Sequence, residues 1–146
     1  MEFIVKTFDD LTIIELYDLL QLRSDVFVVE QDCIFLDLDG KDQKALHVLG
    51  KKDEKLVAYT RLFKPGDYFK ESSIGRVVVK KVERKYGYGH DVMEFSIQTI
   101  NNLYNTSLIK IGAQKYLQKF YESHGFKQVG DEYLEDGIVH IYMIKK

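Results

Sequence analysis

The sequence is short of several residue types, and each shortage excludes a class of protein. It contains one cysteine, Cys33, one proline, Pro65, and no tryptophan. A single cysteine excludes an intrachain disulfide and a cysteine cluster for zinc, which favours a reducing compartment. No apolar run is long enough to cross a bilayer, and Met1–Lys6 lacks the basic start of a signal peptide. We therefore expect a cytoplasmic protein.

Net charge is also small. The formal net charge is −2, so the overall balance gives no reason to expect nucleic acid or an anionic membrane as a partner. Hydrophobic residues make up 45% of the chain and charged residues 30%, which is an ordinary globular composition. Ten tyrosines and nine phenylalanines can fill a sizeable core. The length fits one domain, which we expect to span residues 1–146.

Hydrophobic periodicity predicts a mixed order of strands and helices. We expect strands at 3–8, 45–51, 55–63, 74–80 and 108–111, and a closing hairpin of 126–129 with 138–144 across Asp136-Gly137. Helices are expected from Leu11 through Phe27, after Gly89, and over 117–124 with Gly125 as the C-terminal cap. An acidic loop covers 30–44. This order predicts an α/β or α+β sandwich with a partly antiparallel sheet.

The segment from Val77 to Gly89 indicates an anion site. It reads as a buried strand, then Arg-x-x-Gly-x-Gly, then a helix. Gly87 and Gly89 let the backbone approach a ligand, and the helix N-terminus offers N–H groups suited to a pyrophosphate. Arg84 and Lys85 add positive charge. The alternative is a plain strand-to-helix turn with solvated basic residues, and neither the Walker loop nor the Rossmann fingerprint matches.

A second motif follows the next predicted strand. The segment 113–126 carries Phe120-Tyr121, then three residues, then Gly125-Phe126. It resembles the helix of GNAT acetyltransferases that ends in Phe-Tyr-x-x-x-Gly-Phe. Coming after Arg-x-x-Gly-x-Gly, it is similar to the second of the two core motifs of that family, in the same order.

The resemblance is closest to the ElaA-like branch of this family and covers nearly the whole chain. The similar segments are 22–31, 36–42, His47, 59–62, 74–77 and 135–141. One departure is Lys85, because many members have glycine after the arginine. Lys85 still offers a backbone N–H for cofactor binding. The resemblance implies the GNAT fold: a mixed, mostly antiparallel sheet of six to seven strands with a splayed central pair, flanked by about four helices.

The resemblance also implies acetyl-CoA as co-substrate and no metal. Its pantetheine arm would pair with a strand edge, and one strand N–H would polarise the thioester carbonyl. The residues implied in cofactor binding are Val77, Val78, Val79, Arg84, Lys85, Tyr86, Gly87, Tyr88, Gly89, His90 and Gln114. Gln114 alternatively only caps its helix.

Tyr121 is the implied catalytic residue. It occupies the position where the family keeps a tyrosine near the sulfur. With a reference pKa of about 10 against about 8.5 for a thiol, tyrosine can hydrogen-bond or protonate the leaving thiolate. The alternative is that Tyr121 is only a core aromatic beside Phe120.

The acceptor and its base stay open at this point. A small-molecule or peptide amine arrives as an ammonium, and its proton can go to Glu30, His47, His140 or a water chain. Each of these side chains also has an ordinary structural reading. The acidic loop, with Asp32, Asp37, Asp39 and Asp42, either attracts a cationic acceptor or is simply solvated, and its spacing does not match a calcium loop.

Two other functions compete with an N-acetyltransferase. One is a non-catalytic CoA-binding or sensor domain on the same fold, and the other is an interaction domain that binds no CoA. The retained Tyr121 argues against the first, and the glycines at 87 and 89 argue against the second. An exposed final strand would also allow a homodimer.

Overall fold

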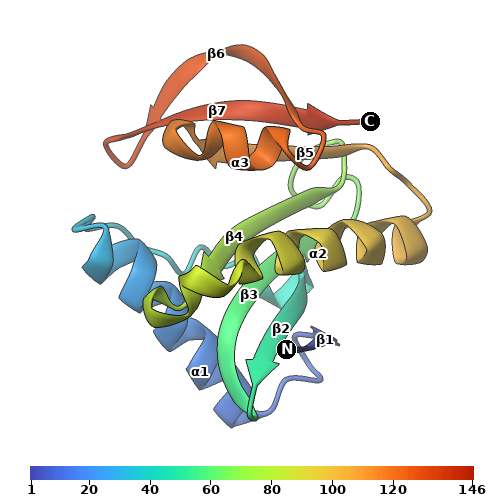
Figure 1. Cartoon of the computed structure of the whole chain (residues 1–146). Coiled ribbons are helices and arrows are strands. Elements are labelled where there is room, and N and C mark those ends of the chain that lie inside the picture. The colour runs from blue at the N-terminus through green and yellow to red at the C-terminus, as the bar shows by residue number, and fades with distance from the viewer.

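The computed structural model describes all residues, 1–146, as seven strands and three α-helices with shorter helical turns (Figure 1). The strands are β1 Glu2–Thr7, β2 Leu46–Lys52, β3 Lys55–Phe63, β4 Ser73–Val79, β5 Ile109–Gln114, β6 Lys127–Glu135 and β7 Ile138–Lys145. The α-helices are α1 Ile13–Arg23, α2 Tyr88–Tyr104 and α3 Gln118–Glu122. A π-helix, η1 Ser24–Glu30, extends α1, and three 3₁₀ turns are η2 Asp42–Lys44, η3 Lys81–Tyr86 and η4 Lys115–Leu117. No helix is long and apolar enough to cross a membrane.

The strands form two antiparallel sheets that meet at one point. The first has the order β1-β2-β3-β4 and the second β5-β7-β6. They are joined where Ser72 forms a parallel bridge to Ile109 and the Lys110 N–H donates to the Ser72 carbonyl at 2.9 Å. Beyond this junction β4 and β5 are not paired with each other, and Figure 1 shows β4 running away from the upper sheet. The predicted splayed strand pair is therefore confirmed.

Helix α1 starts where the sequence predicts, because Thr12 and Glu15 form a capping box. The Thr12 hydroxyl accepts from the Glu15 N–H at 3.0 Å, and the Glu15 carboxylate accepts from the Thr12 N–H at 2.9 Å. The helical path continues through η1, so that Val26 is buried and Phe27 is half-buried. The apolar stripe of this segment covers the first sheet beside Leu49 and Tyr59.

Helix α2 packs its apolar face on the other side of the first sheet. Val92, Met93 and Ile100 are fully buried in a core cluster that also includes residues of both sheets. Leu103, near the end of this helix, is 59% exposed. The core therefore forms around β4 and β5, and α2 begins at the point where those strands separate.

The C-terminal half differs from the prediction in two lengths. The helix predicted over 117–124 is only the short α3 preceded by η4. Gly125 follows it with a φ of +93°, as a helix C-terminal glycine does. Strand β6 is longer than expected because two extra residues bulge out between Val129 and Tyr133. The hairpin turn is confirmed, since Asp136 and Gly137 have φ of +51° and +77°.

Candidate active site between the splayed strands

A cavity of about 670 Å³ lies between the two sheets where β4 and β5 separate. Its wall is formed by β4, the start of α2, β5, α3, the hairpin turn, and the η1 helix with the acidic loop after it. Nine of the predicted site residues line it: Val77, Val78, Val79, Arg84, Gly87, Gly89, His90, Gln114 and Tyr121. The fold thus collects into one cavity residues that are far apart in the sequence.

The predicted phosphate loop is a 3₁₀ turn closed by a left-handed glycine. Gly87 has a φ of +75°, with its N–H donating to the Arg84 carbonyl at 3.4 Å, and α2 begins directly after it. A left-handed residue without a Cβ is what this reversal requires. The N-terminus of α2, with Gly89 and His90, faces the cavity and provides the positive end of a helix dipole.

Three residues of the predicted loop do not line the cavity. The turn η3 directs Lys85 and Tyr86 outward, where the Tyr86 and Tyr88 rings lie 5.4 Å apart. The Lys52 ammonium sits 4.2 Å from the Tyr86 ring centroid. The 3₁₀ turn therefore rotates Lys85 and Tyr86 away from the cavity, and Tyr88, the first residue of α2, packs against the hydrophobic core.

Arg84 is held by an acidic partner from η1. Its Nη1 and Nη2 donate to the Glu30 carboxylate at 2.6 Å and 2.9 Å, and its Nε donates to the Val79 carbonyl at 3.1 Å. The hydrogen bond from Arg84 lowers the pKa of Glu30. Glu30 is therefore a charged partner of Arg84 and a weak proton acceptor at neutral pH.

Strand β4 carries a bulge that the sequence did not reveal. Tyr59 pairs with Val78 but Arg61 pairs with Gly75, so β4 has one extra residue there. Arg76 lies in this bulge with a φ of +48°, which is rare for a residue with a side chain. The bulge changes the direction of β4 directly beside the predicted acetyl-binding residues Val77 and Val78.

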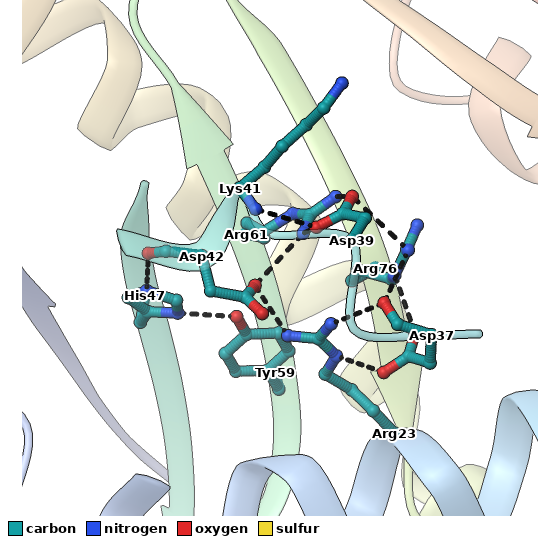
Figure 2. A network of polar contacts seen from close by, with 9 residues as sticks. All are labelled: Arg23, Asp37, Asp39, Lys41, Asp42, His47, Tyr59, Arg61 and Arg76. Atoms are coloured by element: carbon teal, nitrogen blue, oxygen red, sulfur yellow. Dashed lines mark hydrogen bonds and ion pairs between the residues drawn. The ribbon is translucent and has the colours of Figure 1, made fainter. Parts of the chain in front are cut away.

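A cluster of arginines and aspartates supports this bulge from behind (Figure 2). Arg76 Nε donates to Asp37 at 2.7 Å, and Arg23 Nε donates to the other Asp37 oxygen at 2.8 Å. Asp42 accepts from Arg23 at 2.8 Å and from Arg61 at 3.0 Å. We call Arg23, Asp37, Asp39, Asp42, Arg61 and Arg76 the arginine–aspartate cluster; its only buried polar atom without a partner is Arg61 Nε.

The cluster corrects both readings of the acidic loop. Asp37 and Asp42 are each 6% exposed, so they are neither solvated nor free to attract an acceptor. Burial alone would raise the pKa of Asp39, but hydrogen bonds and charge from Arg61 outweigh it and lower the pKa to about 2. Only Asp32, among the four loop aspartates, is exposed. Three arginines from three different elements neutralise the other three.

His47 contacts this cluster through Asp42 and does not line the cavity. It is fully buried, with Nδ1 2.6 Å from the Tyr59 hydroxyl and Nε2 2.9 Å from the Asp42 carbonyl. A carbonyl only accepts, so Nε2 carries the proton and Nδ1 accepts from Tyr59. Burial lowers the pKa of His47. His47 therefore has no free lone pair and no access to a ligand, which removes it as a candidate base.

Tyr121 is 7% exposed and lines the cavity from α3. Its ring packs edge-on against Phe120 and Phe126, and its hydroxyl makes no hydrogen bond within the chain. Burial raises the pKa of Tyr121, so the phenol is protonated at neutral pH. A proton donor without a partner is thus oriented by aromatic packing at the edge of the cavity.

Gln114 also lines the cavity, with a partner that the sequence did not indicate. Its side-chain amide exchanges two hydrogen bonds with that of Gln31, each of 3.2 Å. Gln31 follows η1, 83 positions earlier in the chain. No local pattern connects the two residues, because only the tertiary fold brings the end of η1 to β5.

Comparison with known proteins agrees with this geometry. Residues 27–146 match the family model of the acetyltransferase (GNAT) domain. The chain belongs to the GNAT family. It is 42% identical to the protein ElaA of Escherichia coli K12 over 139 residues, which cover 94% of this chain and 91% of that protein.

Solved structures of other proteins have the same fold. An acyl-CoA N-acyltransferase from Pseudomonas aeruginosa superposes with a TM-score of 0.93 at 40% identity, and E. coli ElaA with 0.91 at 38%; both comparisons cover 100% of each chain. An aminoglycoside 6′-N-acetyltransferase complexed with coenzyme A shares only the fold, at 15% identity, a TM-score of 0.71, and coverage of 97% and 96%. The seven-strand arrangement with a split between β4 and β5 is therefore that of the GNAT fold.

Proposed function

We propose that residues 1–146 form one acetyl-CoA-dependent N-acetyltransferase domain, which transfers an acetyl group to a primary amine within a ternary complex. The observation that carries this proposal is the cavity itself. It extends from the glycine turn before α2, past the bulged strand β4, to the hydroxyl of Tyr121. A narrow thioester and an amine can meet there away from bulk water.

The cofactor-binding residues would contact three parts of acetyl-CoA: the pyrophosphate, the pantetheine arm and the acetyl carbonyl. Residues 84–90 at the helix N-terminus would bind the pyrophosphate, with Lys85, Tyr86 and Tyr88 contributing backbone groups only. The free edge of β4 at Val77, Val78 and Val79 would pair with the pantetheine arm, and one of their N–H groups would polarise the acetyl carbonyl. Gln114, oriented by Gln31, would contact the cofactor from β5.

The reaction would be a direct attack. The lone pair of the neutral amine forms the C–N bond at the acetyl carbon, and the C–S bond breaks with its electron pair on sulfur. Tyr121 donates its proton to that thiolate and regains one from the nitrogen, so the products are an amide and CoA-SH. Burial raises the pKa of Tyr121, so the phenol is protonated when the thiolate leaves and its hydroxyl can donate a hydrogen bond to the sulfur.

A thermal-shift titration with acetyl-CoA tests the proposal. Ligand at about 100 times its dissociation constant stabilises the folded state by roughly 2.7 kcal/mol, which is readily measured. We expect stabilisation by acetyl-CoA and by CoA but not by ATP, followed by thiol release when primary amines are added. Stabilisation without any thiol release would support a non-catalytic CoA sensor instead, and no stabilisation at all would exclude both.

A further inference from the structure

One histidine that lines the cavity, His140, has a ring nitrogen without a hydrogen bond within the chain. His140 on β7 lines the cavity, and its Nδ1 lies 2.8 Å from the Ile138 carbonyl. Because a carbonyl only accepts, Nδ1 carries a proton, and in the neutral ring Nε2 holds the lone pair. That nitrogen lies 3.3 Å from the carboxylate of Glu135.

A lone pair that faces a carboxylate lacks a donor between them. His140 and Glu135 can bond either when Nε2 takes a proton or when a positively charged donor lies between them and contacts both side chains. An acceptor ammonium is such a donor. We infer that His140 and Glu135 bind the ammonium of the acceptor, and that His140 Nε2 removes its proton before attack. This inference rests on the proposed acetyl transfer.

Three other candidates for this role are engaged. Glu30 is paired with Arg84, and His47 is buried outside the cavity with both ring nitrogens bonded. Of the four carboxylates that line the cavity, Asp39 is paired with Arg61 at 2.8 Å, and Asp136 lies exposed in the hairpin turn. Glu135 has only His140 as a charged partner, and its side chain is 55% exposed. It therefore has room for an incoming cation.

A smaller side cavity shows where the body of the acceptor would lie. It has a volume of about 110 Å³ and shares Tyr68, Gly75, Arg76, Gly112 and Glu135 with the main cavity. Its remaining wall is largely aromatic, with Phe63, Phe69, Tyr133 and Tyr142. Gly112 keeps it in shape, since a Cβ there would lie 2.8 Å from the Tyr133 hydroxyl.

The charges around the side cavity restrict the acceptor to one ammonium group. Glu135 is the only carboxylate in its wall, and the two arginines that line it, Arg61 and Arg76, are already paired with aspartates of the cluster. Lys110 Nζ lies 4.9 Å from the Phe69 ring and 4.8 Å from the Tyr142 ring, and Lys41 Nζ lies 4.8 Å from the Tyr68 ring. A polyamine would be repelled there. The geometry suits a primary monoamine with an aromatic or apolar body.

The proton balance is simple. The ammonium R–NH₃⁺ gives one proton to Nε2, which leaves R–NH₂ and an imidazolium stabilised by Glu135. After transfer, the imidazolium releases that proton to solvent. Acetyl-CoA and R–NH₃⁺ thus become the acetamide, CoA-SH and one proton, and no other reactant is required.

Two amines of similar shape test the assignment. Benzylamine is an ammonium at neutral pH and needs a base, whereas aniline is already neutral and needs none. We expect His140→Gln to lower kcat/KM for benzylamine about a hundredfold and to change kcat/KM for aniline little. Glu135→Gln should raise KM for benzylamine more than it lowers kcat. The matched control is Glu132→Gln on the same strand, whose exposed pair with Lys115 lies outside both cavities.

Every outcome bears on the inference. Equal losses of kcat/KM for both amines, or no loss in either variant, would overturn the base assignment. A wild-type protein that acetyl-CoA stabilises but that acetylates neither amine would overturn the acceptor class and leave the proposed cofactor intact. Absence of acetyl-CoA stabilisation would instead reject the proposed function. If His140→Gln does not fold, Glu135→Gln still tests the inference, because the exposed Glu135 side chain can be replaced without disturbing the core.

Discussion

The arginine–aspartate cluster and the rest of the cavity wall are both rich in charge and lie beside the same bulged strand, yet they differ in how fully their groups are bonded. In the cluster nearly every donor meets an acceptor, and Arg61 Nε is the exception. In the cavity wall the Tyr121 hydroxyl has no partner and His140 Nε2 faces a carboxylate.

The difference shows how to separate structural from functional polar residues in this chain. Buried charges cost several kcal/mol each in desolvation unless they are paired, so a saturated cluster supports the fold. Groups left open beside a cavity have their missing partner in a ligand. The four predictions below test this comparison, from the largest expected effect to the smallest.

Breaking the cluster should affect stability and not the cavity. Asp42→Asn removes the charge shared by Arg23 and Arg61, so the three arginines of the buried cluster face only two carboxylates. We expect a loss of about 3–5 kcal/mol in the free energy of unfolding, measured by urea denaturation. The exposed pair of Glu132 with Lys115 serves as control, since Glu132→Gln should cost at most about 1 kcal/mol. Equal losses in both variants would show that burial does not distinguish them.

Removing the Tyr121 hydroxyl should lower turnover and leave stability unchanged. Tyr121→Phe keeps the aromatic packing against Phe126 and deletes only the proton donor. We expect kcat for acetyl transfer to fall about a hundredfold, while the acetyl-CoA dissociation constant and the melting temperature stay near wild type. Steady-state thiol release and the thermal-shift titration measure the two effects. Unchanged turnover would assign Tyr121 to the core alone.

Filling the glycine turn should block the cofactor. Gly87→Trp adds a bulky side chain at a left-handed residue that lines the cavity. We expect loss of the roughly 2.7 kcal/mol of stabilisation by acetyl-CoA at 100 times the dissociation constant. Gly66→Trp is the matched control, because Gly66 has a φ of +92°, also has open space around it, and does not line the cavity. If both variants respond alike, the turn has no specific role in binding.

The cluster should also give the protein an acid-sensitive component of stability. Hydrogen bonds from Arg61 overcome the effect of burial and hold the pKa of Asp39 at about 2, below its ordinary value of 3.8. A carboxyl with a lowered folded-state pKa stabilises the protein above pH about 4, and this contribution is lost as the pH falls toward 2. It amounts to about 2 kcal/mol. Asp39→Asn should flatten the stability profile over that range, and an unchanged slope would contradict the pairing.

Much of the fold could be predicted from local patterns. The strand at 55–63 matches β3, the capping residue Thr12 precedes α1, and Asp136-Gly137 forms the hairpin turn. Each depends on neighbours within a few residues, such as an alternation, a cap or a turn pair. The length of β6 and the shortness of α3 were missed, because a bulge and a 3₁₀ turn leave no clear local pattern.

The residues of the candidate site also fall into those that local motifs predict and those that only the tertiary structure places. Gly87, Gly89 and Tyr121 belong to motifs along the chain, and all three line the cavity. The outward rotation of Tyr86 and the exclusion of His47 were not visible in the sequence. Burial and hydrogen-bond partners decide whether a histidine is available, and both depend on residues distant along the chain.

By itself the sequence determined the family, the order of strands and helices, and the two motifs on which the cofactor assignment depends. The order of the elements follows from periodicity and from turn and cap residues, whereas the family follows from motifs that resemble those of its members; both are local along the chain. Only the tertiary structure decided that Asp37, Asp39 and Asp42 are neutralised by arginines and that Glu135 faces His140. Electrostatic pairing depends on distance in space. The cluster joins α1, the acidic loop, β3 and β4, and Glu135 meets His140 across the hairpin of β6 and β7, so neither pairing follows from a local pattern.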